Sequence, residues 1–357
     1  MRKLYWFPFL SSVSLLFLLV STVSAEDSML AKSTFYVDGQ PFESHYLMRD
    51  GEVYIPSLFI KETGAQVDWN EEYQTVLFKG NDQTFSMPLD KKTLLTFNEQ
   101  TKNWEEKKLK AGAILFDDQT FVPLKTVIEE LGMTSHYEPQ SAKTFIQSNI
   151  DIQPNYFAQG SRNNRFIALT FDDGPDTYYT PLILDILKEK GVHATFFVVG
   201  KQVQKHPDIL KRIVEEGHGI GNHTFNHPNL TKTWSEQVQL EIEKTQSLIQ
   251  DTVGRKPSLI RPPYGAFTKA DIGLFNDKGL VNVMWSVDTL DWSGLPAEDI
   301  LETVLTNAFP GSIVLQHNFQ AEEHQLDGSL EALPQMIDEL KKRGYTFVTV
   351  QTLMDSD

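Results

Sequence analysis

Two pairs of side chains in the C-terminal half of the chain are of the types that bind a metal ion and activate water. Asp172 and Asp173 follow an apolar segment and precede Gly-Pro, which places both carboxylates on a sharp turn. His223 and His227 are four residues apart, a spacing that favours one face of a helical turn, which Pro228 would end. Two imidazoles and one carboxylate can hold a zinc ion and leave a coordination position for water.

Each pair also has an ordinary structural interpretation. Asp-Gly-Pro sequences are common in turns, and an aspartate before a helix often caps it. Two histidines at this spacing are often surface or helix-capping residues. The combination in one chain is what points to a hydrolase.

Further segments offer groups for the rest of such a reaction. Arg261 precedes two prolines and is either a surface arginine or the partner of a buried carboxylate. Asp291 stands beside Trp292 in a polar turn. His317 follows an apolar strand and is either an acid–base group or a satisfied histidine of the core.

The composition narrows the class of partner. The 357 residues include 32 Lys and Arg against 48 Asp and Glu, a formal charge of −16. Because phosphate binding needs a basic face, nucleic acid is excluded as a partner. The chain has no cysteine, so a metal would rest on histidine and carboxylate. These numbers leave the oligomeric state unknown.

Residues 1–25 are typical of a secretory signal peptide. A positively charged start is followed by an apolar run from Val13 to Val20 and by small residues that end at Ala25. We expect cleavage after Ala25 and a secreted, extracellular protein associated with the cell envelope. The alternative is a membrane anchor formed by residues 7–23, so a membrane is a partner only if this segment stays uncleaved.

Residues 33–148 contain an internal repeat. Each copy has a strand ending in proline, a helix that stops at glycine, and a strand pair; the copies begin at Val53 and Thr120. The repeat resembles the small α+β stalk domain at the N-terminus of copper amine oxidases, over most of residues 34–147. It contains no cluster of metal ligands or nucleophiles, so wall binding and plain structural support stay open as its role.

Residues 149–164 are polar and are predicted to form a linker. Over residues 165–352, strand and helix patterns alternate. Strands are expected at 165–171, 194–199, 259–260, 281–286, 311–316 and 345–350, and helices at 180–190, 206–216 and 237–252. Such βα units predict parallel strands in a barrel or an open sheet, and each chemical segment follows a strand, as loops at the C-terminal face of a barrel do. Trp234 and Trp285 are expected to serve in packing.

The order of these segments resembles the polysaccharide deacetylase family, the NodB-homology group of carbohydrate esterase 4 type. The resemblance covers roughly residues 163–352 and implies a distorted (β/α) barrel that removes acetyl groups from N-acetylated sugars. By matching motifs, Asp173, His223 and His227 would ligate the metal. It would be Zn²⁺ in most members, with other divalent transition metals such as Co²⁺ possible. Asp172 would be the general base, held in place by Arg261.

The remaining roles follow from the same resemblance. His317 would be the general acid for the departing amine, tuned by Asp291. The Tyr264 backbone N–H would help to stabilise the oxyanion, and Trp292 and Leu315 would line the pocket for the acetyl methyl. One position departs from the family: Asn318 stands where aspartate is common, and we expect little effect on catalysis.

The sequence therefore predicts an α/β enzyme, a distorted (β/α) barrel preceded by a small α+β domain with an internal repeat. We expect a secreted, metal-dependent hydrolase of linear amides that deacetylates N-acetylglucosamine residues of a cell-envelope glycan, with peptidoglycan as the expected partner. The alternatives are an O-acetyl (xylan-type) esterase, a chitooligosaccharide deacetylase, and a wall-binding scaffold without activity.

Overall fold

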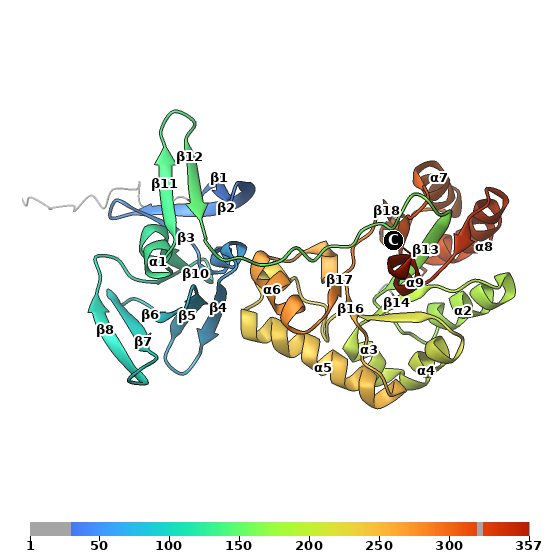
Figure 1. Ribbon diagram of the computed structural model, residues 1–357, viewed down its shortest axis with the longest axis horizontal. Helices are drawn as coiled ribbons and strands as arrows, with labels where there is room; N and C mark the ends of the chain where they lie inside the picture. Colours follow the sequence, from blue (N-terminus) through green and yellow to red (C-terminus); the bar gives the residue numbers. More distant parts are fainter. Residues whose placement is uncertain (1–29, 320–323, 357) are drawn as a thin grey trace, which may run out of the picture.

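The computed structural model describes residues 30–319 and 324–356, and the predicted signal peptide and the alternative membrane anchor lie outside them. Within the described residues, no helix combines the length and the apolar character needed to cross a bilayer. Figure 1 shows a strand-rich N-terminal body and a larger body of strands and helices, joined by an extended segment.

The N-terminal body contains two sheets. The larger sheet has the order β11-β12-β1-β2-β3-β10-β9, and the smaller has the order β4-β5-β6-β7-β8. The larger sheet comprises β1 (Ala31–Val37), β2 (Gln40–Arg49), β3 (Glu52–Pro56), β9 (Ile114–Phe116), β10 (Gln119–Pro123), β11 (Thr134–Glu138) and β12 (Lys143–Gln147). The smaller comprises β4 (Gln66–Asn70), β5 (Thr75–Gly80), β6 (Gln83–Pro88), β7 (Thr93–Asn98) and β8 (Asn103–Lys108).

The internal repeat is present in this body. The first copy is β3, the 3₁₀ helix η2 (Ser57–Thr63), β4 and β5; the second is β10, the helix α1 (Leu124–Glu130), β11 and β12. Gly64 (φ 94°) and Gly132 (φ 67°) end the two helices in the left-handed conformation that glycine adopts most easily. The copies meet where β3 pairs antiparallel with β10, with Ile55 opposite Val122. The predicted repeat is confirmed, although its first helix is a 3₁₀ helix.

The C-terminal body is built on parallel strands. Their order is β17-β16-β15-β14-β13-β19-β18, with β20 paired to the start of β13. The strands are β13 (Phe166–Asp172), β14 (Thr195–Val198), β15 (Gly219–Asn222), β16 (Leu259–Ile260), β17 (Val281–Asn282), β18 (Val287–Asp288), β19 (Ile313–His317) and β20 (Thr346–Phe347).

Helices cover this sheet. They are α2 (Tyr179–Lys190), α3 (Gly200–Lys205), α4 (Pro207–Glu215), α5 (Ser235–Val253), α6 (Lys269–Asp277), α7 (Ala297–Asn307), α8 (Asp327–Lys342) and α9 (Val350–Asp355), with short 3₁₀ turns η3 (Leu230–Lys232), η4 (Pro263–Gly265) and η5 (Asp291–Ser293). The amphipathic pattern explains the packing: in α2, Ile183, Leu184 and Leu187 face the core formed by Leu169 of β13 and its neighbours.

The sheet curves into a distorted barrel. The end strands β17 and β18 are separated along the chain by residues 283–286 alone, a stretch that can reach at most about 18 Å. The two ends of the sheet therefore lie close together, and the prediction of a distorted (β/α) barrel is confirmed. The single strand expected over residues 281–286 is wrong, because β17 ends at Asn282 and β18 begins only at Val287.

The segment between the bodies lies along the barrel. Asn155 donates to the carbonyl of Leu280 (2.7 Å), and the amide of Phe157 donates to the carbonyl of Asn282 (2.8 Å). Figure 1 shows this stretch as the long green trace between β12 and β13. The segment is thus held against the barrel by these hydrogen bonds. The domain boundaries predicted at residues 33–148, 149–164 and 165–352 stay a prediction.

Candidate active site

Asp173, His223 and His227 lie together at the C-terminal ends of the strands. Oδ1 of Asp173 is 3.3 Å from Nε2 of His223 and 3.1 Å from Nε2 of His227. The histidines do not share a helical turn as predicted: they lie in the loop after β15, where Thr224 (φ 63°) and His227 (φ 62°) are left-handed. The left-handed backbone, rather than helical spacing, brings the two imidazoles together.

The donor atoms of this trio fit a divalent cation. Nδ1 of His223 donates to the carbonyl of Arg261 (2.6 Å), so the proton is on Nδ1 and the lone pair of Nε2 points toward Asp173. Oδ1 of Asp173 is buried without a hydrogen-bond partner. Within the part of the chain that the structure describes, this is the one cluster of three such side chains that could close on a metal.

The charge state of Asp173 agrees with that role. Burial acts to raise the pKa of its carboxyl, but the neighbouring imidazoles of His223 and His227 outweigh this effect and hold the pKa well below the usual range. Asp173 is therefore ionised at neutral pH, as a metal ligand must be.

Asp172 is held by Arg261 inside the barrel. Nη1 of Arg261 lies 2.8 Å from Oδ1 of Asp172 and also donates to the hydroxyl of Thr170 (2.9 Å). The other guanidinium nitrogens donate to the carbonyls of Val283 and Met284, which are freed where the sheet is interrupted between β17 and β18. Because each guanidinium nitrogen donates and four of its five N–H groups have acceptors, Arg261 can be wholly buried (0% exposed) and still charged.

His317 and Asp291 form a second pair across the site. Nδ1 of His317 donates to Oδ1 of Asp291 (2.8 Å), and its backbone amide donates to Oδ2 (2.9 Å). Ser329 also donates to Oδ2 (3.0 Å). Burial opposes protonation of the imidazole, but the hydrogen bond and charge of Asp291 outweigh it and raise the pKa of His317 to about 9. His317 is therefore a cation at neutral pH.

Strained backbone gathers around these groups. Non-glycine residues with positive φ line the loops of the site: Asp173, Thr224, His227, Tyr264 and Leu290. Such conformations persist only where the surrounding structure imposes them, and they cluster at functional sites. Tyr264 (φ 60°) is 68% exposed, and its ring lies edge-on to that of His227, with centroids 4.7 Å apart.

The groups described above lie around one cleft with a volume of about 700 Å³. It is lined by Asp172, Asp173, His223, His227, Pro262, Tyr264, Gly265, Trp285, Asp288, Trp292, Leu315, His317, Phe319 and Gln325. Trp292 is 47% exposed at the rim, and Leu315 is buried (4%) in the wall. The structure thus brings together every residue that the sequence assigned to the site except Arg261 and Asp291, which lie behind the lining and hold Asp172 and His317.

Comparisons with known proteins find a matching family for each of the two bodies of the structure. Residues 159–283 match the polysaccharide deacetylase family, and residues 32–146 match the copper amine oxidase N-terminal domain. A peptidoglycan-N-acetylglucosamine deacetylase of Bacillus cereus is 44% identical over 201 residues, which are 56% of this chain and 72% of the relative. The chain belongs to the polysaccharide deacetylase family.

A further relative and a solved structure place the barrel in the same group. A peptidoglycan-N-acetylmuramic acid deacetylase of Bacillus subtilis is 34% identical, over 61% of this chain and 82% of its own. The Bc1960 peptidoglycan N-acetylglucosamine deacetylase, solved with 4-naphthalen-1-yl-N-oxidanyl-benzamide, matches with a TM-score of 0.55 and 44% identity, over 56% and 92% of the two chains. The predictions of a polysaccharide deacetylase and of a copper-amine-oxidase-like domain are confirmed.

Glu241 supports the deacetylase site but was not found from the sequence. It lies on α5, and its Oε2 accepts from the amides of Phe225 (2.9 Å) and Asn226 (2.7 Å), while Oε1 accepts from the Asn226 side chain (2.7 Å). It therefore fixes the turn between the two histidines. The available signal was an acidic residue within the buried stripe of α5, between Val238 and Ile242.

Two residues outside the predicted site also contribute to it. Trp285, expected to serve in packing, lines the cleft as well. Asn318 holds the turn after Asp173: its Oδ1 accepts from the amide of Gly174 (3.0 Å) and its Nδ2 donates to Thr180 (3.0 Å). A Cβ on Gly174 would lie 2.3 Å from that Nδ2, so this glycine is needed for the close approach. That asparagine in place of aspartate has little effect on catalysis stays a prediction.

Proposed function

We propose that this protein is a secreted, metal-dependent deacetylase that hydrolyses the N-acetyl group of N-acetylglucosamine residues in peptidoglycan. The observation that carries the proposal is the meeting of the Asp173–His223–His227 trio, the Asp172–Arg261 pair and the His317–Asp291 pair in one cleft. Deacetylation needs a ligand set, a base and an acid at the same place, and these three groups supply them.

Asp173, His223 and His227 would hold the metal. A nitrogen- and oxygen-donor set with no thiolate suits Zn²⁺, and Co²⁺ takes the same ligands. When bound, such an ion would supply a nucleophile at neutral pH and polarise the acetyl carbonyl. The carboxylate of Asp173 would neutralise part of the charge of such an ion, and the second nitrogen of His223 is already fixed by the carbonyl of Arg261.

The chain's own groups move the protons. Asp172 is bound by Arg261 through Oδ1, which leaves Oδ2 to accept a proton from the attacking water. The amide N–H of Tyr264 donates to the carbonyl oxygen as negative charge develops on it. His317, a cation held by Asp291, donates the proton of Nε2 to the departing amine as the C–N bond breaks. The products are acetate and a glycan amine.

The substrate assignment is supported by a sequence relative and a solved structure named for peptidoglycan N-acetylglucosamine, while another relative is named for peptidoglycan N-acetylmuramic acid. The cleft is open to solvent at Tyr264 and Trp292, so a polymer can lie across it. Export is proposed from the composition of residues 1–25.

The sugar can be identified directly. Peptidoglycan treated with the protein is digested to muropeptides, and mass spectrometry locates the lost acetyl groups. We expect the loss on N-acetylglucosamine. Loss on N-acetylmuramic acid alone would contradict the sugar assignment, and activity on acetylated xylan without activity on either amino sugar would favour the O-acetyl esterase.

A further inference from the structure

Lys61 of the N-terminal domain is fully buried at the interface with the barrel domain. It lies on η2 and is 0% exposed. Its Nζ donates to the carbonyls of Leu230 (2.8 Å) and Thr233 (2.9 Å) and lies 3.0 Å from Oδ1 of Asp271. An ammonium group has three donors, and all three acceptors belong to the other domain.

A buried lysine is an unusual way to join two domains. Lysine is almost never fully buried unless it is paired, because removing its charge from water is costly. Simple docking of two surfaces is achieved by apolar contacts, such as the stacking of Trp69 on Trp234 at this interface (centroids 6.3 Å apart). Contact between the two domains does not require a charged residue at this position. The charge of Lys61 is explained instead by the three acceptors that it binds in the barrel domain.

The first two acceptors lie close in sequence to a candidate metal ligand. Leu230 begins η3, three residues after His227, and Thr233 follows the end of η3. The side chain of Asn229 accepts from the amide of Thr231 and caps this turn. The segment from His227 to Thr233 is thus fixed at its far end by Lys61.

The third acceptor lies behind the turn that carries Tyr264. Oδ2 of Asp271 accepts from the amide (2.8 Å) and the hydroxyl (2.7 Å) of Thr268, which caps α6. Its Oδ1 faces Lys61. Thr268 stands four residues after Tyr264, so Lys61 and Asp271 fix the end of this second loop of the site.

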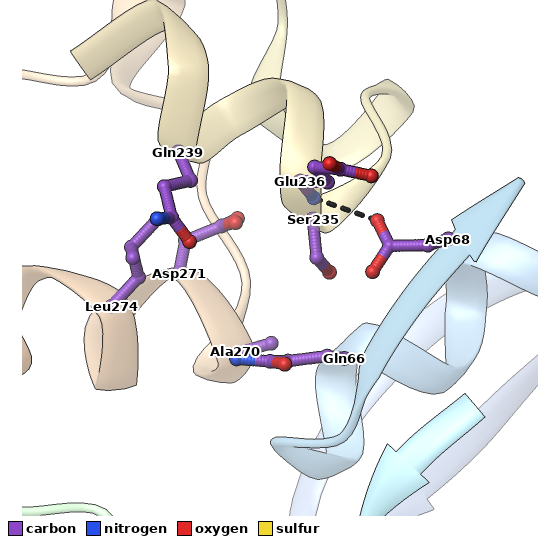
Figure 2. A pocket seen from close by; sticks show the side chains of 8 residues that line it. All are labelled: Gln66, Asp68, Ser235, Glu236, Gln239, Ala270, Asp271 and Leu274. Atoms are coloured by element: carbon purple, nitrogen blue, oxygen red, sulfur yellow. Dashed lines mark hydrogen bonds between the residues drawn. The ribbon is translucent and has the colours of Figure 1, made fainter. Parts of the chain in front are cut away.

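The rim of the same interface is packed less tightly. Figure 2 shows the side chains that line a pocket between β4 and the starts of α5 and α6, where Gln66 and Asp68 face polar side chains of the barrel domain. The pocket has a volume of about 210 Å³. Asp68 accepts from the amide of Glu236 (2.6 Å), and the neighbouring side chains leave space between them. The N-terminal domain therefore holds the loops that carry His227 and Tyr264 through the buried Lys61 and not through this rim.

We propose that Lys61 is a positioning residue of the active site, through which the N-terminal domain holds the loops that carry His227 and Tyr264. The inference rests on the proposed function of those loops. It makes the N-terminal domain a structural part of the deacetylase rather than a spacer.

Lys61→Met in the full chain tests this, because methionine keeps much of the length and removes the charge. The affinity for Co²⁺ is measured by competition with a chromophoric chelator, together with the visible spectrum of bound Co²⁺ and with kcat and KM on N-acetylglucosamine oligomers. We expect Co²⁺ to bind about 10-fold more weakly, as when a group supporting a metal ligand is lost, with a changed spectrum and a fall in kcat larger than the rise in KM.

Asp38→Asn is the matched control. It breaks another ion pair between the domains, Asp38–Lys269 (2.8 Å), without touching either carbonyl acceptor of Lys61. We expect Co²⁺ affinity within about twofold of the wild type, below the effect of a lost supporting group. An equal loss in both variants, or unchanged affinity, spectrum and kcat in Lys61→Met, would overturn the proposal.

Lys61→Met leaves Asp271 unpaired and can prevent folding. The double variant Lys61→Met/Asp271→Asn removes both charges, so no unpaired ion stays buried, and it is expected to fold with the same loss of Co²⁺ affinity. Wild-type affinity in the folded double variant would overturn the proposal. A wild-type protein that binds Co²⁺ but releases no acetate contradicts the proposed function alone; one that binds no Co²⁺ contradicts both.

Discussion

Arg261 and Asp172 form an ion pair in the centre of the barrel, with 2.8 Å between Nη1 and Oδ1. The pair stands where the sheet is interrupted, and Arg261 also satisfies the carbonyls of Val283 and Met284 there. One side chain therefore orients the proposed base and completes the hydrogen bonding of the barrel wall. Loss of Arg261 is expected to affect both stability and catalysis.

Arg261→Met should lower the free energy of unfolding by about 3–5 kcal/mol, because it leaves the carboxylate of Asp172 buried without its partner. Urea unfolding followed by circular dichroism measures the change. Arg261→Met/Asp172→Asn should lose less than the single variant, since no unpaired charge is left. A double variant that is less stable than Arg261→Met would show that the ion pair is not the source of the loss.

Asp291→Asn should move the alkaline limb of activity to lower pH. The pKa of His317 is raised to about 9 by Asp291, from an ordinary value of 6.5, so the acid stays protonated at neutral pH and kcat/KM falls as the pH rises through about 9. Without the charge of Asp291, the fall should begin closer to 6.5. Profiles of kcat/KM from pH 5 to 10 for the wild type and the variant measure this change. If the alkaline limb lies at the same pH in both proteins, His317 is not the general acid.

The same ion pair links His317 to folding stability. A histidine whose pKa is raised in the folded state contributes stability that is complete below pH 6.5 and is lost as the pH rises through about 9. The difference in unfolding free energy between the wild type and Asp291→Asn should therefore be largest near pH 6.5 and should disappear as the pH rises above about 9.

Glu241→Gln should weaken metal binding about 10-fold, because the turn between His223 and His227 loses a charged acceptor. Isothermal titration with Zn²⁺ measures the affinity. Glu243→Gln is the control, since Glu243 lies on the same helix and pairs with Lys278 away from the site. Equal affinities in the two variants would mean that Glu241 does not support the ligands.

Glu62→Gln should stabilise the protein in alkaline solution. Burial, and the charge of Asp271 to a lesser degree, raise the pKa of Glu62 to about 8 from an ordinary value of 4.5. Between these values the unfolded chain is ionised while the folded chain keeps the proton, so stability falls as the pH rises. The Tm of Glu62→Gln should exceed that of the wild type at pH 8.5 and match it at pH 4.5. A difference that does not depend on pH would contradict the shift.

The sequence predicted those parts of the site that follow directly from residue type and position. Asp172 and Asp173 follow a strand, and parallel strands bring such residues to one end of a barrel. The predicted helical geometry of His223 and His227 was wrong, because Thr224 and His227 have a left-handed backbone. Glu241 of a distant helix holds the turn between them, which residue spacing alone does not indicate.

The parts that could not be predicted depend on contacts between distant residues. The interruption of the strand at residues 283–286 reflects the carbonyls that Arg261 binds, 22 and 23 residues along the chain. Lys61 meets its acceptors across 169 and 172 residues, and in the sequence it is only one more lysine on a short helix. No local pattern distinguishes such a residue from a solvated one.

The most direct test of the central claim is the release of acetate from purified peptidoglycan by the protein supplied with Zn²⁺. We expect release that is abolished by a chelator, restored by added Zn²⁺, and lost in Asp173→Ala, since Asp173 is the acidic ligand in the trio. Full activity of Asp173→Ala, or release that a chelator does not affect, would contradict a metal-dependent deacetylase built on Asp173, His223 and His227.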